Sequence, residues 1–225
     1  MKYLIISAIA LSTSIAPIQA ANFVVSSAFD IFTPSTRGDA TSTYVGWDTF
    51  DDGGAGNEII NDSTPDLGSS VGAFVTLNAE DHLSGSGNFY SGGGSVNERI
   101  AFDTAGIVGG GFTSVIAQGI TLFGPLGSDV GFSEIHGVAP EVIQLTNGAG
   151  KGQLWAKWDL PGNETSYEFT MTGGGNVSLD KLTIDTSWSA SRFSPDSASA
   201  IPEPSSALLS LVGLSLFLGN RRRTR

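Results

Sequence analysis

The sequence predicts an all-β fold, a two-sheet antiparallel sandwich of jelly-roll-like form, between an N-terminal signal peptide and a short C-terminal hydrophobic helix. Three observations predict this fold. Several short segments alternate apolar and polar residues, as half-buried strands do. The 30 glycines gather between these segments, where they favour turns. No segment of the body repeats apolar residues with the 3.6-residue period of an amphipathic helix, so packed sheets must supply the core.

Aromatic and β-branched residues predict the strands of the first half, and residues 57–68, rich in Asn, Asp and Pro, predict a long loop. Strands are expected at 23–25, 44–50, 72–77, 95–102 and 112–123, the last as one or two strands. In the segment 72–77, Ala73, Val75 and Leu77 share one face by alternation.

The clearest alternation lies in residues 154–172. One face of the first strand carries Leu154, Ala156, Trp158 and Leu160, and the other carries Trp155, Lys157 and Asp159. Tyr167, Phe169 and Met171 repeat the pattern in the next strand. The turn sequence Pro161–Asn163 stands between them, which predicts that the two strands pair as a hairpin.

The final strand changes the parity of its apolar residues. Val177 and Leu179 share one parity, whereas Leu182, Ile184 and Trp188 share the other. One extra residue near 180–181, a β-bulge, would place all five on one face. The strand from 177 to 184 resembles the last strand of jelly-roll domains of the carbohydrate-binding-module and lectin type. The Ser- and Ala-rich residues 189–200 then predict a flexible linker.

The N-terminus has the order of a secretory signal peptide. Lys2 supplies a positive charge, residues 4–11 are apolar, and Ile18–Ala20 is a plausible cleavage site. Residues 1–20 are therefore predicted to be removed. The remaining body, residues 21–188, has the size of one domain.

The C-terminus, residues 201–225, has three parts in order. Pro202, Glu203 and Pro204 form a stiff segment without regular pairing. The apolar run 206–219 makes a helix of roughly 21 Å, shorter than the ~30 Å hydrocarbon core of a bilayer. Arg221, Arg222 and Arg223 follow it, and basic residues beside an apolar segment favour the cytoplasmic side. An ordinary tail anchor or a terminal helix of the domain remains the alternative.

This order of Pro-Glu-Pro, short apolar helix and arginine cluster resembles the PEP-CTERM sorting signal of Gram-negative bacteria that make exopolysaccharide. The resemblance covers residues 201–225 and implies processing by an exosortase, a membrane protease-transpeptidase, near Pro202, Glu203 and Pro204. It further implies export through the inner membrane, a transient association with that membrane, and a final place at the cell surface or in the extracellular matrix.

Charge and cysteine content exclude several classes of function. The chain has 11 basic and 22 acidic residues. The two terminal signals hold five of the basic residues, Lys2 and four arginines, and one acidic residue, Glu203, so the body carries 21 acidic against 6 basic residues, a net charge of −15. A surface so acidic excludes nucleic acid as a partner. Since the chain has no cysteine, disulfides and thiolate sites are excluded.

Two candidate ligand sites follow from residue chemistry. Hard oxygen ligands for calcium gather in one Gly-rich segment at Asp48, Asp51, Asp52, Asn57 and Glu58, where a solvated acidic turn is the alternative. Trp155 is turned away from the core face and is the first candidate to stack on a sugar ring, unless a neighbouring loop buries it.

These observations predict a non-enzymatic, exported protein of the cell surface or exopolysaccharide matrix, with a structural or adhesive role. The sequence shows no metalloprotease motif or phosphate-binding loop. A carbohydrate-binding module, with calcium as a supporting cofactor, is the alternative. A glycosidase or polysaccharide lyase is the third hypothesis, because paired acids among so many carboxylates also fit glycoside hydrolysis.

Overall fold

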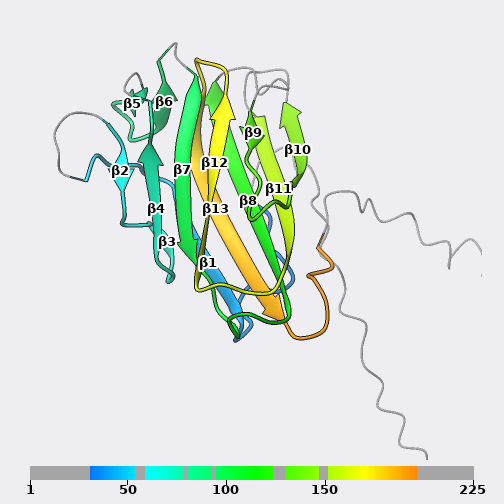
Figure 1. The fold of residues 1–225 in the computed structure, drawn as a ribbon. Helices are drawn as coiled ribbons and strands as arrows, with labels where there is room; N and C mark the ends of the chain where they lie inside the picture. Colours follow the sequence, from blue (N-terminus) through cyan, green and yellow to red (C-terminus); the bar gives the residue numbers. More distant parts are fainter. Residues whose placement is uncertain are drawn as a thin grey trace, which may run out of the picture.

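The structure, a computed structural model, describes residues 31–53, 59–78, 81–92, 95–123, 130–146 and 152–196. Within these ranges the chain forms thirteen β-strands and no helix. The strands make two antiparallel sheets that pack face to face, so the predicted all-β sandwich is confirmed (Figure 1).

The larger sheet has eight strands. Six of them lie side by side in the order β10 (Glu141–Thr146), β11 (Gly152–Pro161), β8 (Phe112–Phe123), β13 (Ser178–Ser189), β1 (Ser42–Trp47) and β3 (Leu67–Gly68). The other two extend one end of β13: β6 (Phe89–Ser91) pairs with β13, and β5 (Asp81–Leu83) pairs with β6.

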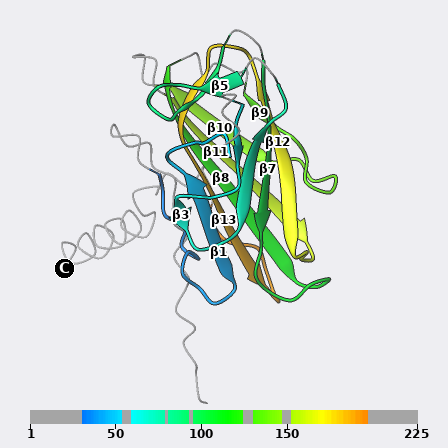
Figure 2. The same ribbon diagram turned by 90° about the vertical axis from the view of Figure 1, so that its left-hand side faces the viewer.

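The smaller sheet has five strands and covers one face of the larger sheet. Its order is β2 (Asn61–Asp62), β4 (Gly72–Thr76), β7 (Val96–Asp103), β12 (Ser166–Gly173) and β9 (Gly131–Phe132). Figure 2 shows the two layers from the side, with β7 and β12 in one layer and β1, β13 and β8 in the other. The predicted strands at 44–50, 95–102 and 112–123 correspond to β1, β7 and β8, whereas residues 23–25 lie outside the described part.

Aromatic rings fill the space between the sheets. Trp158 of β11 stacks on Phe169 of β12 with ring centroids 4.8 Å apart and planes 24° from parallel. Behind this pair the larger sheet presents two alanines, Ala156 and Ala117, which lie opposite each other in neighbouring strands. Small residues beside large rings let the two sheets interdigitate without voids, which is how sandwich cores reach native packing density.

The predicted β-bulge is confirmed. In the pairing of β13 with β8, Leu179 lies opposite Thr121 and Lys181 opposite Ile120, so Asp180 is the extra residue. Because the bulge restores the parity, Leu179, Leu182 and Ile184 all enter the core, and Val177 joins them just before the strand. Trp188 does not join this cluster and stays half-buried at the far end of β13.

The predicted hairpin between residues 154–160 and 167–171 is wrong. β11 pairs with β8 and β10 in the larger sheet, whereas β12 pairs with β7 and β9 in the smaller one. The turn at Pro161–Asn163 therefore crosses from one sheet to the other. Alternation predicted the inward side of both strands correctly. It did not show whether they pair in one sheet, because strands of two opposite sheets also face the same core.

The predicted face of residues 72–77 is also wrong. Gly72, Phe74 and Thr76 point inward, and Leu77 is exposed. Phe74 packs on Phe50 with ring centroids 4.8 Å apart, so the large ring sits in the core in place of the three aliphatic side chains. In residues 57–68, predicted as one loop, the described part contains the two-residue strands β2 and β3.

The outer face of the larger sheet, which points away from the smaller sheet, is covered by two segments from opposite ends of the described chain. Residues 31–39 and 190–196 lie along this face, and we call them the N-terminal strap and the C-terminal strap. Ser35 of the first donates its N–H to a carboxylate oxygen of Asp196 in the second, at 3.0 Å. This contradicts the first part of the linker predicted at 189–200, because Ser189 ends β13 and Asp196 is buried. The body thus extends to residue 196, beyond the predicted boundary at 188.

Candidate functional site

A groove of about 510 Å³ opens between the two straps at the end of β13. It is lined by Ser35, Thr36, Asp39, Thr41, Ser187, Trp188, Ser189, Arg192, Phe193, Ser194 and Pro195. This volume lies in the range of small-molecule sites. One wall comes from the first described turn of the chain and the other from its last segment, so the groove exists only because both straps fold onto the sheet.

Trp188 lines the groove at the end of β13. Its indole Nε1 donates to the carbonyl oxygen of Gly110 at 2.7 Å, and its backbone exchanges hydrogen bonds with Thr41. The ring lies so close to Gly106 and Gly111 that a β-carbon at either position would approach within 2.6 Å of it. The loop before β8 therefore needs glycine there, and it fixes the orientation of the ring that borders the groove.

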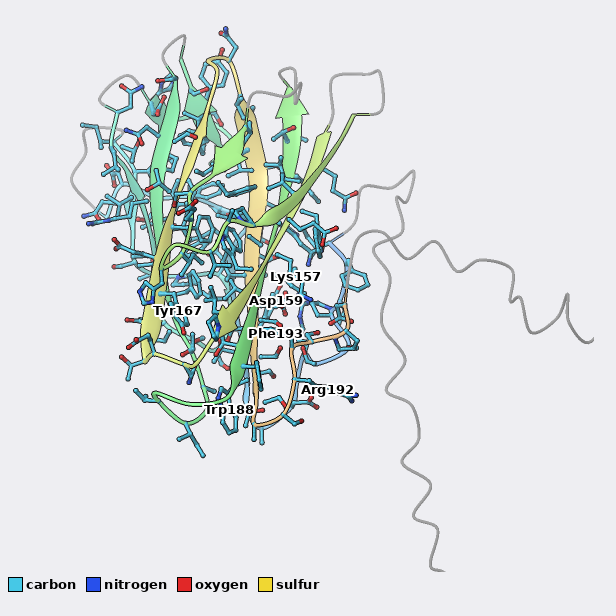
Figure 3. All side chains as sticks on the ribbon, turned by 45° about the vertical axis from the view of Figure 1, so that its right-hand side comes forward. Lys157, Asp159, Tyr167, Trp188, Arg192 and Phe193 are labelled. Carbon is cyan, nitrogen blue, oxygen red and sulfur yellow. The ribbon has the colours of Figure 1, made fainter. Side chains whose placement is uncertain are left out.

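Arg192 and Phe193 form the wall on the C-terminal strap. Phe193 is half-buried because its ring meets Phe112 edge to face, with centroids 5.0 Å apart. Arg192 is exposed, and no ion pair joins it within the described ranges. Figure 3 shows Trp188, Arg192 and Phe193 around the end of the sheet, with Lys157 and Asp159 beside them. The opposite wall carries the exposed carboxylate of Asp39.

A buried lysine holds the C-terminal strap on the sheet. Lys157 of β11 is 8% exposed and donates from Nζ to the carbonyl oxygen of Ser194 at 2.8 Å. The same ammonium lies 3.2 Å from a carboxylate oxygen of Asp159. The hydroxyl of Ser114 completes the set, because it donates to Asp159 and accepts from the N–H of Ser194. The buried ammonium of Lys157 therefore has partners, as a buried charge requires.

The N-terminal strap is held by an amide and by an ion pair. The side chain of Gln118 in β8 exchanges two hydrogen bonds with the backbone of Phe32, at 2.9 and 2.8 Å, in the manner of a further strand. Further along the same strap, Arg37 makes two hydrogen bonds to the carboxylate of Asp185 and lies over the ring of Tyr44. Burial raises the pKa of Asp185 above its ordinary value, and Arg37 opposes this shift. A second hollow of about 450 Å³ lies against Arg37, Tyr44 and Ser70.

The chemistry of the groove is that of recognition through polar groups beside aromatic rings. The lining combines Ser and Thr residues, one arginine and one aspartate with the aromatic residues Trp188 and Phe193. Such a surface offers donors, acceptors and apolar ring edges to a polar, ring-shaped ligand such as a sugar.

Trp155, the predicted sugar-stacking residue, is fully buried, which corrects its predicted exposure. It does lie on the outer face, as alternation predicted, opposite Gln118 of β8. That face is covered, because the backbone of Phe32 lies on the neighbouring Gln118. Alternation determines the side of a sheet that a residue takes, whereas the covering segment comes from a distant part of the chain.

The predicted calcium segment is only partly within the described residues. Asp48 lies 3.7 Å from Lys181, and Asp51 accepts a hydrogen bond from the N–H of Gly53 at 2.7 Å. Asp52 is described, whereas Asn57 and Glu58 lie outside the described part. Among the described residues no three His, Asp or Glu side chains are grouped as a metal ion needs. Calcium binding by this segment stays a prediction.

The sorting residues Pro202, Glu203, Pro204, Arg221, Arg222 and Arg223 lie outside the described residues, as does the signal peptide. In the part of the chain that the structure describes, no helix has the length and hydrophobicity needed to cross a membrane. Export and processing therefore stay predictions.

Sequence reasoning missed the groove residues Arg192, Phe193 and Asp39, and placed Trp188 in the core. One signal was present: an arginine and a phenylalanine stand side by side in a stretch of small polar residues. An aromatic residue in a supposed linker indicates that the segment packs on something.

Comparison with known proteins gives no match to a family model, to a curated protein or to a solved structure.

Proposed function

We propose that this chain is an exported β-sandwich protein with a structural or adhesive role, and without catalysis, at the cell surface or in the extracellular polysaccharide matrix. The observation that carries the proposal is the three-part C-terminal segment, residues 201–225, which resembles an exosortase signal. The fold supports it: the sandwich ends in a strap that is hydrogen-bonded as far as Asp196, so the Pro-Glu-Pro segment follows a folded body after only a few residues.

Fractionation of the producing cells tests this proposal. We expect the protein in the surface or extracellular fraction, without the residues that follow the Pro-Glu-Pro segment. The variant Glu203→Ala should stay in the inner membrane at full length. The matched control Glu168→Ala changes an exposed carboxylate of β12 and should be processed normally. A wild-type protein that stays in the cytoplasm, or that persists at full length in the membrane, would contradict the proposal.

The groove between the straps favours a second candidate function, binding of a carbohydrate. Its lining includes aromatic residues and several Ser and Thr residues, a combination that can provide stacking and hydrogen bonding together. The site differs from the one predicted at Trp155, and it places Arg192 and Asp39 in reach of the same ligand. Calcium would then act by supporting a loop rather than by contacting the sugar.

A glycan array with calcium or with a chelator tests this second function. We expect Arg192→Ala and Asp39→Ala to weaken binding by about 10-fold or more, because each removes a charged hydrogen-bonding group from the site. Both side chains are exposed, so neither change should unfold the domain. Arg99→Ala, an exposed arginine on the opposite sheet, is the control. Binding that is equal in all four proteins would exclude the groove.

A further inference from the structure

Two acidic side chains lie in the interior at one end of the sandwich. Asp81 begins β5 and is 1% exposed, and Glu98 in β7 is fully buried. The two side chains are close enough for Asp81 to act on the pKa of Glu98 through hydrogen bonding and through its charge. β5 is attached to the larger sheet through β6, whereas β7 belongs to the smaller sheet. In Figure 1, β5 and β6 lie at one end of the sandwich, and β7 runs from that end along the smaller sheet. The contact between the two carboxyl groups therefore joins the two sheets.

The groups around Glu98 leave it without a cation. Thr76 of β4 donates its hydroxyl to Oε1 at 2.9 Å, and Met171 of β12 lies opposite on the other side. The second oxygen, Oε2, is buried and receives no hydrogen bond from an N–H or hydroxyl of the described residues. The neighbouring Arg99 points to solvent.

The strands β5 and β6 surround Asp81 with few ionisable groups among the described residues. Ser91 of β6 lies opposite Asp81, and the ring of His82 lies against Tyr90, with centroids 5.2 Å apart. Among the described groups, Asp81 is the one ionisable side chain whose charge acts on Glu98.

Two ionised carboxylates in contact in a dry interior repel each other strongly, and each would lack the water that stabilises its charge. One proton between them removes the repulsion, and the protonated group then donates a hydrogen bond to the one carboxylate that stays ionised. Burial, followed by the hydrogen bond and charge of Asp81, raises the pKa of Glu98 to about 9.

We propose that Asp81 and Glu98 share one proton at neutral pH, and that this carboxylic acid–carboxylate bond is a pH-sensitive link that fastens β5 and β6 to the smaller sheet. In the unfolded chain a glutamate loses its proton near pH 4.5. The folded protein keeps this proton over a range in which the unfolded chain has lost it. The contribution of Glu98 to stability is therefore complete below about pH 4.5, declines as the pH rises, and is lost by about pH 9.

Carbon-13 NMR of the glutamate side-chain carboxyls in the purified protein tests the shared proton without any mutation. We expect one glutamate carbon to titrate above pH 7. That late signal should be missing in Glu98→Gln and present in the control Glu168→Gln. A protein whose glutamates all titrate below pH 6 would overturn the proposal.

Thermal unfolding across the pH range tests whether the Asp81–Glu98 link contributes to the stability of the domain. Glu98→Gln keeps a donor for Asp81 but cannot lose a proton, so its melting temperature should fall less with rising pH than that of the wild type. Equal pH profiles for the two proteins would contradict the link. A second measurement adds calcium at about 1 mM at neutral pH. If calcium raises the melting temperature of the wild type but not that of Glu98→Gln, the two carboxylates share a cation in place of a proton, which would contradict the proposal. Should Glu98→Gln not fold, the wild-type titration decides alone.

Discussion

Arg37 binds Asp185 through two hydrogen bonds, from Nε and from one terminal nitrogen, at 2.5 and 2.6 Å. The two residues are 148 positions apart. Arg37 also lies over the ring of Tyr44, 3.7 Å from its centroid. Tyr44 and Asp185 are paired neighbours on β1 and β13, so a single guanidinium fixes the N-terminal strap to two strands at once. An arginine–carboxylate pair with two parallel hydrogen bonds fixes the orientation of both side chains as well as stabilising their contact.

Arg37→Ala should destabilise the domain by about 2–3 kcal/mol, because the carboxylate of Asp185 would stay covered without its cation. We place the loss at the low end for a buried pair, since Arg37 is 21% exposed and water can partly replace it. Urea unfolding measures the change. The control Arg99→Ala should stay within about 0.5 kcal/mol of the wild type, and a similarly small effect of Arg37→Ala would show that the strap is not held here.

The same variant should change the pH dependence of stability. Burial raises the pKa of Asp185, and Arg37 lowers it part of the way back. A carboxyl with a raised pKa contributes less stability as the pH rises above its unfolded value of 3.8. Without Arg37 the pKa should rise further, so the gap in melting temperature between wild type and variant should widen from pH 4 towards neutral pH. A gap that stays constant would contradict this account.

Local chemistry was enough to predict the inward side of most strands and the bulge in β13. Leu154, Trp158 and Phe169 face the core as their alternation predicted, and the parity change after Leu179 marked the extra residue. Both features depend on neighbours a few positions away, and sequence spacing encodes them directly. The partner strand of β11 was not encoded in this way. A turn such as Pro161–Asn163 reverses the chain direction in either case. The next strand can pair with the first in the same sheet, or it can pack across the core in the other sheet.

The candidate groove could not be predicted, because its walls come from both ends of the described chain. Trp155 and Trp188 illustrate the difficulty. The first sits on the outer face but is covered by a strap, and the second sits on a core strand but stays half-buried at its end. Their exposure depends on long-range contacts such as that of Ser35 with Asp196, 161 positions apart. No local pattern contains that information.

Lys157→Met should release the C-terminal strap. The variant keeps the volume and apolar stem of the side chain but loses the ammonium that donates to Ser194 and contacts Asp159. We expect a loss of about 1–3 kcal/mol, the cost of leaving buried acceptors without a donor. Hydrogen exchange should rise at residues 190–196 more than in β8. Lys181→Met is the matched control, because Lys181 is 31% exposed and lies 3.7 Å from Asp48 in a surface pair. Equal exchange in the two variants would argue against Lys157 as the fastening residue.

The pair Gly106→Ala and Gly109→Ala should show whether the loop before β8 holds Trp188 in place. Both glycines have positive φ angles, 106° and 83°, so alanine at either position carries a backbone cost of about 1–2 kcal/mol. A β-carbon on Gly109 meets nothing within 4 Å, whereas one on Gly106 would lie 2.4 Å from Cγ of Trp188. Gly106→Ala must therefore displace the indole as well, which should add about 1–3 kcal/mol to the loss of stability.

The displaced indole should also change the groove, because Trp188 is one of the residues that line it. We expect the fluorescence of Trp188, obtained as the difference from a Trp188→Phe background, to shift in Gly106→Ala and to stay unchanged in Gly109→Ala. Urea unfolding of the two variants measures the stability difference under the same conditions. If Gly106→Ala is no less stable than Gly109→Ala and the fluorescence does not move, the loop before β8 does not hold the indole in place.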